Sequence, residues 1–77
     1  MVEMNVKIDT IEKAKAFCNL CSKCVDDVFV YSEKYIVSGK SIMGLFSLNL
    51  SEPLRVEFCG NVPDDVINEV NQFVVGE

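Results

Sequence analysis

The chain's four cysteines are the residues best suited to chemistry. Three recur at intervals of three residues and the fourth lies far downstream: Cys18, Cys21, Cys24 and Cys59. Thiolates at such spacing resemble the ligand runs of iron–sulfur and zinc sites. On a continuous helix, however, each step of three residues turns the side chain by about 60° and rises about 5 Å, so three sulfurs converge poorly on one ion. We therefore expect reduced thiols packed in the core and no metal or cofactor. A cysteine-dependent metal or redox protein stays open as an alternative.

Histidine is absent from the 77 residues. Its absence removes the commonest general base, the commonest neutral metal ligand and any phosphohistidine chemistry. The paired carboxylates Asp26-Asp27 and Asp64-Asp65 are neighbours only in sequence, and we expect them to end one helix and to begin another as solvated caps. The sequence therefore favours a protein that is not an enzyme.

The stretch GKSIMGLFSLNL, residues 39–50, combines a helix cap, a short apolar helix and a turn. Ser41 is a favoured N-cap residue because its hydroxyl can accept a hydrogen bond from a free backbone N–H. Asn49 and the Ser51-Glu52-Pro53 turn end the helix soon afterwards. Its apolar side chains occupy more than one face, so some are expected to meet solvent or a partner. Exposure is expected for Ile42 and Met43, and burial for Leu45, Leu48 and part of Phe46.

Residue periodicity predicts the elements that position this stretch. In chain order they are a strand at 2–8, an amphipathic helix at 10–24, a hairpin at 28–31 and 35–37, the short helix after Ser41, a strand at 54–59 and a helix from Pro63 onward. Asp9 followed by Glu12 predicts a capping-box-like start for the first helix. Asn61 or a neighbour is expected to cap the last helix, and Tyr31 and Tyr35 are expected to face each other across the hairpin.

The element order β-α-β-β-α-β-α is typical of an α+β open-faced β-sandwich, with a four-stranded antiparallel sheet and its helices on one face. Residues 1–77 are expected to form one domain. The net charge of −5 argues against nucleic acid as a partner. No segment approaches the ~20 apolar residues that cross a bilayer, so we predict no membrane association and a cytoplasmic location. An exposed strand edge would allow a weak homodimer besides a monomer.

From Ala14 to Leu48 the chain resembles HPr, the small phosphocarrier of the bacterial sugar phosphotransferase system, in its Gram-positive form. The likeness is concentrated in Lys40-Ser41-Ile42-Met43-Gly44 followed by Phe46-Ser47-Leu48, which is similar to that family's regulatory serine motif. The strand, Gly60 and amphipathic helix that follow match the family's last third. The resemblance implies the HPr-like fold.

The chain departs from that family after the first predicted strand. The family carries there a phosphorylated histidine, followed one residue later by an arginine and then a proline. The corresponding residues are Thr10-Ile11-Glu12-Lys13, in a shortened loop. Thr10 cannot replace a phosphorylated imidazole, and Glu12 would repel a phosphoryl group that the family's arginine would bind. The resemblance thus implies a degenerate phosphohistidine site at Thr10 and Glu12, and no phosphotransfer through this chain.

The family's regulatory serine carries over onto Ser41. In the family an ATP-dependent kinase modifies this serine, and the modified protein binds a transcription regulator. Phosphate would add about −1.5 to −2 charge at a helix N-terminus, where the helix dipole favours it. The resemblance implies a regulatory module that binds phosphotransferase-system components, an HPr kinase or a transcription regulator through Lys40, Ile42, Met43 and Phe46. A simple capping role for Ser41, in a degenerate paralogue without signalling, is the alternative.

Overall fold

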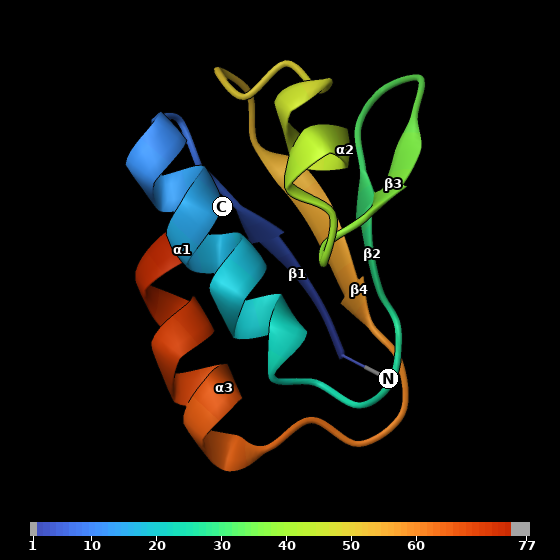
Figure 1. The fold of residues 1–77 in the computed structure, drawn as a ribbon, viewed down its shortest axis with the longest axis vertical. Helices are drawn as coiled ribbons and strands as arrows, with labels where there is room; N and C mark the ends of the chain where they lie inside the picture. Colours follow the sequence, from blue (N-terminus) through green and yellow to red (C-terminus); the bar gives the residue numbers. More distant parts are fainter. Residues whose placement is uncertain (1, 75–77) are drawn as a thin grey trace.

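The computed structural model describes residues 2–74, which form four strands and three helices (Figure 1). The elements are β1 (Val2–Val6), α1 (Ile11–Ser22), β2 (Val28–Tyr31), β3 (Ile36–Ser38), α2 (Ile42–Phe46), β4 (Leu54–Phe58) and α3 (Asp64–Val70), with a 3₁₀ turn at Asn71–Phe73. None of the helices in this part of the chain is long and apolar enough to span a bilayer.

The strands form one sheet in the order β1-β4-β2-β3, and every pair is antiparallel. Phe58 lies opposite Val2 on β1 and opposite Val28 on β2, so these side chains share one face of the sheet. The helices lie on that face and leave the other face open (Figure 1). The predicted fold class, an α+β open-faced sandwich with a four-stranded antiparallel sheet, is confirmed.

The core lies between the sheet and the helices. Phe17 of α1 meets Phe73 edge to face, with ring centroids 5.8 Å apart, and both side chains are buried. Such aromatic pairs stabilise a core beyond the area they bury. α1 packs against both α3 and α2 in the helical layer, and α2 also contacts β3.

The structure corrects the predicted start and end of the first helix. Thr10, not Asp9, is the N-cap, and its Oγ1 accepts from the Lys13 backbone N–H at 3.0 Å. Asp9 instead pairs with the Lys13 ammonium at 3.1 Å. The helix ends at Ser22, so Asp26-Asp27 follows a loop rather than ending the helix. Asp9 and Thr10 are both favoured N-cap residues, so the sequence alone does not tell which of them caps the helix.

Other boundaries and pairings also differ. β1 ends at Val6 rather than at residue 8. Pro63, not Asn61, occupies the N-cap position of α3. No side-chain hydrogen bond caps this helix. Tyr31 lies opposite Ile36 rather than Tyr35. Several side chains of the predicted helix stripes also face solvent, with exposed fractions of 63% for Ile11, 93% for Val25 and 39% for Val74.

On the open sheet face, Tyr31 and its charged neighbours form a network of polar contacts. Its hydroxyl donates to a Glu57 carboxylate oxygen at 2.8 Å, and the Arg55 guanidinium lies 4.2 Å from its ring centroid. Arg55 also pairs with Glu3 at 3.2 Å. The hydrogen bond to Glu57 is the main cause that raises the Tyr31 pKa above its ordinary value.

Candidate functional site

α2 begins at a serine cap, as predicted. The Ser41 Oγ accepts from the Gly44 backbone N–H at 3.1 Å, and the Ser41 carbonyl accepts from the Leu45 N–H at 3.0 Å. The serine side chain is exposed at this end of the helix. Because α2 has only five residues, tertiary contacts must hold it in place rather than helix propensity.

Two glycines allow the backbone around Ser41 to lie close to the rest of the fold. A Cβ on Gly39 would lie 2.9 Å from the Cys21 sulfur and 2.9 Å from a Val28 methyl carbon. A Cβ on Gly44 would lie 3.2 Å from the Cβ of Val37, which places α2 directly against β3. The segment before Ser41 is therefore packed tightly on α1 and β2.

Lys40 joins this segment to α1 through polar contacts. The Cys18 thiol donates to the Lys40 carbonyl oxygen at 3.4 Å, and the Lys40 ammonium donates to the Val25 carbonyl oxygen at 3.5 Å. The Lys40 side chain is half-buried. Lys40 thus precedes Ser41 by one residue, while its ammonium is directed to the loop that follows α1.

The four residues predicted to bind partners define what we call the α2 surface: Lys40, Ile42, Met43 and Phe46. Met43 is 77% exposed, as predicted. Ile42 is half-buried rather than exposed, and Phe46 is 41% exposed. Leu45 and Leu48 are buried, as predicted. The five-residue helix turns Leu45 to the core, which leaves Met43 and Phe46 on the outer side.

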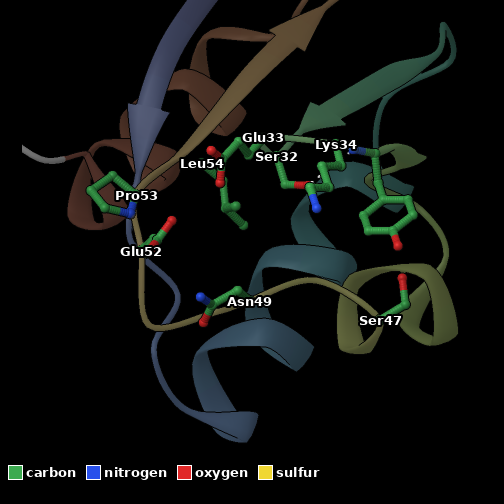
Figure 2. A pocket seen from close by; sticks show the side chains of 9 residues that line it. Ser32, Glu33, Lys34, Ser47, Asn49, Glu52, Pro53 and Leu54 are labelled. Carbon is green, nitrogen blue, oxygen red and sulfur yellow. Dashed lines mark hydrogen bonds between the residues drawn. The ribbon is translucent and has the colours of Figure 1, made fainter.

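A pocket of about 250 Å³ adjoins the C-terminal end of α2, and we call it the turn pocket. It is lined by Ser32, Glu33, Lys34, Tyr35, Ser47, Asn49, Glu52, Pro53 and Leu54 (Figure 2). Sequence reasoning missed this site because three separate segments build it. The polar β2–β3 turn and the Asn49 to Pro53 turn gave only a loop signal in the sequence.

Thr10 and Glu12 lie apart from the Ser41 segment along α1. Lys40 meets α1 at Cys18, which is about two helical turns beyond Thr10. The Thr10 hydroxyl caps α1, and the exposed Glu12 carboxylate adds negative charge to the first turn. The beginning of α1 is therefore capped by Thr10 and carries Glu12 next to the Asp9–Lys13 ion pair.

The cysteines divide into two pairs. Cys21 and Cys24 are buried in the core, as predicted, whereas Cys18 and Cys59 are half-buried. Burial, with smaller effects of the neighbouring thiols, raises the pKa of Cys21 to about 12, and burial also raises the pKa of Cys24. Thiols so shifted are poor nucleophiles and poor metal ligands. Among residues 2–74 no group of three cysteine or acidic side chains is placed to hold a metal ion.

The helices over an open antiparallel sheet define an α+β sandwich. Comparison with solved structures shows which known fold of this class the chain resembles. HPr-C-His from Thermoanaerobacter tengcongensis is 23% identical, with a TM-score of 0.78 over 96% of this chain and 91% of that one. The phosphocarrier protein HPr from Bacillus anthracis is 18% identical, with a TM-score of 0.72 over 96% of each chain.

A third similar structure is the histidine-containing phosphocarrier protein of a Mycoplasma, at 16% identity and a TM-score of 0.75 over 97% of this chain and all of that one. No protein-family model matches the sequence, and no curated protein matches it significantly. The chain has the HPr fold, and at these identities the likeness establishes the fold alone.

Proposed function

We propose that this domain is a non-enzymatic regulatory module that binds protein partners through the α2 surface and is controlled by phosphorylation at Ser41. The observation that carries the proposal is the position of Ser41. Its exposed hydroxyl heads a helix whose outer side chains, Met43 and Phe46, are themselves exposed. Phosphate at that hydroxyl would place a double negative charge against these apolar side chains and change what the surface can bind.

The start of α1 does not support phosphoryl transfer. The chain contains no histidine, and the Thr10 hydroxyl cannot replace a phosphorylated imidazole. Glu12 lies in the first turn of α1, where a phosphoryl group would meet its negative charge. We infer that Thr10 and Glu12 stand where the HPr carriers have their phosphohistidine loop, and that this chain passes no phosphoryl group along the pathway.

The proposed partners are proteins: phosphotransferase-system components, an HPr kinase or a transcription regulator in a bacterial cytoplasm. The HPr fold of the domain and the exposed apolar residues of α2 support this class of partner. The domain is proposed to be a monomer or a weak homodimer. The outer edge of β1 is partly paired, because the Lys7 backbone N–H donates to the Phe73 carbonyl oxygen at 2.8 Å and Val6 and Val74 form an antiparallel bridge.

The test is incubation of the domain with an HPr kinase and ATP, followed by mass spectrometry of the peptides. We expect one phosphate, located at Ser41 and absent from Ser41→Ala. Ser47→Ala is the matched control, because Ser47 is an exposed serine at the other end of the same helix. No incorporation at Ser41, or incorporation that survives Ser41→Ala, would reject the regulatory role of this hydroxyl.

A further inference from the structure

The turn pocket adjoins the α2 surface but has a different chemistry. Its walls carry two carboxylates, Glu33 and Glu52, and one ammonium, Lys34. Among residues 2–74 no ion pair joins these three charged groups to one another or to any other residue. The pocket therefore has a local charge of −1, in a chain whose net charge is −5.

The uncharged polar groups of the pocket are largely occupied within the fold. The Ser47 hydroxyl donates to the Gly44 carbonyl at 2.6 Å. The Asn49 side-chain oxygen accepts from both the N–H and the hydroxyl of Ser51, at 3.2 and 2.6 Å. These contacts fix the α2–β4 connection on one side of the hollow, while Glu33 and Lys34 come from the β2–β3 turn on the other (Figure 2).

The remaining lining is apolar or aromatic. Leu54 is 2% exposed and forms part of the interior, and Pro53 and Tyr35 add further carbon surface. A ligand with an aliphatic stem and a cationic end would suit the carbon surface, the two carboxylates and the Tyr35 ring of this pocket, with Lys34 as the one opposing charge. The arginine side chain has this combination, since its guanidinium forks onto carboxylates and stacks on aromatic faces.

We propose that the turn pocket receives an arginine side chain of a protein partner that binds the α2 surface. The inference rests on the proposed function and deepens it by naming a basic anchor in the partner. The fold already holds one such arrangement, because Arg55 lies over the Tyr31 ring and pairs with Glu3 on the open sheet face. The turn pocket offers Tyr35 with Glu33 and Glu52 and has no arginine of its own. A negative domain also attracts a basic partner segment at long range.

The test is an ¹⁵N–¹H NMR titration of the whole domain with N-acetyl-arginine amide. Its neutral isostere, N-acetyl-citrulline amide, is the matched probe, and N-acetyl-aspartate amide is the anionic one. We expect the arginine probe to shift the amides of Ser32, Lys34 and Asn49 while the other two probes leave them in place. Raising the salt concentration should weaken the binding, because exposed charges are screened.

Charge variants of the pocket give the decisive test, because removing a carboxylate and removing the ammonium should change the affinity for the arginine probe in opposite directions. Glu33→Gln and Glu52→Gln should each lower the affinity for the arginine probe by about two- to fivefold, whereas Lys34→Gln should raise that affinity by a similar factor. Asp65→Asn on α3 is the control and should change nothing. The three substituted pocket residues, Glu33, Lys34 and Glu52, are exposed, so the variants are expected to fold.

The inference is overturned if arginine and citrulline probes shift the amides equally, or if Lys34→Gln weakens binding and the aspartate probe binds instead. These outcomes are separate from the kinase test. Phosphorylation of Ser41 without arginine binding removes only the pocket's role, while arginine binding without phosphorylation supports the pocket and removes the regulation of Ser41.

Discussion

The starts of α1 and α2 use the same local chemistry in different surroundings. In each, a hydroxyl side chain caps the helix by accepting from the backbone N–H three residues on, at 3.0 Å for Thr10 and 3.1 Å for Ser41. The first turn of α1 contains Glu12 and Lys13, whereas that of α2 contains no charged residue and follows Lys40. A hydroxyl cap alone therefore does not identify a regulatory site, and we expect the charges around each cap to set how well it would accommodate phosphate.

The buried side chains that anchor the two helices give the largest expected effects. Phe17→Ala in α1 should lower the free energy of unfolding by about 3–5 kcal/mol, and Leu45→Ala in α2 by about 2–5 kcal/mol. Both side chains are fully buried. Urea unfolding followed by circular dichroism measures the changes, with Met43→Ala as the exposed control. If Leu45→Ala cost no more than Met43→Ala, α2 would not be anchored by its buried side chain.

Thiol reactivity tests how firmly the Ser41 segment is packed on α1. Cys21 lies against Gly39 and has a pKa raised to about 12, whereas Cys18 is half-buried. We expect Cys21 to react with a thiol reagent at least roughly tenfold more slowly than Cys18 in native buffer, with the difference lost in denaturant. Peptide mass spectrometry after timed alkylation gives the rates. Equal native rates would mean that the segment opens readily over Cys21.

Removing each cap should have a moderate and similar effect. Thr10→Ala and Ser41→Ala should each lower the free energy of unfolding by about 1 kcal/mol, because each leaves a backbone N–H without its acceptor. Ser41→Asp should retain most of the stability, since aspartate also caps and its charge suits a helix N-terminus. Urea unfolding of the three variants measures this. A Ser41→Ala domain as stable as the parent would show that the hydroxyl does not stabilise α2.

The caps also show how far the sequence predicts this molecule. Ser41 was predicted correctly because a serine before an apolar run is a local signal, and the strand alternation of residues 2–6 and 54–58 is equally local. The cap of α1 was misplaced by one residue because Asp9 and Thr10 both suit the position. The turn pocket was missed because its walls meet only after the β2–β3 turn folds beside the α2–β4 connection. Such sites depend on tertiary geometry, which no local pattern contains.

The smallest expected effect concerns the ion pair that distinguishes the start of α1. The hydrogen bond from Lys13 is the main cause that holds the Asp9 pKa below its ordinary value of 3.8. A carboxyl whose pKa is lowered in the folded state adds stability above its unfolded pKa, and that stability is lost as the pH falls through the folded pKa. The contribution of Asp9 should thus be complete well above pH 3.8 and disappear at more acidic pH.

Lys13→Gln sharpens this last point, because it removes the ammonium and leaves the Thr10 cap in place. We expect the Asp9 pKa to rise toward its ordinary value in this variant, as measured by NMR titration of the side-chain carboxyl carbon. Lys15→Gln is the control, since Lys15 is an exposed lysine of the same helix that is not paired with Asp9. An unchanged Asp9 pKa in Lys13→Gln would assign the shift to the backbone hydrogen bond and to Lys7 instead, and the Asp9–Lys13 pair would no longer distinguish the start of α1 from that of α2.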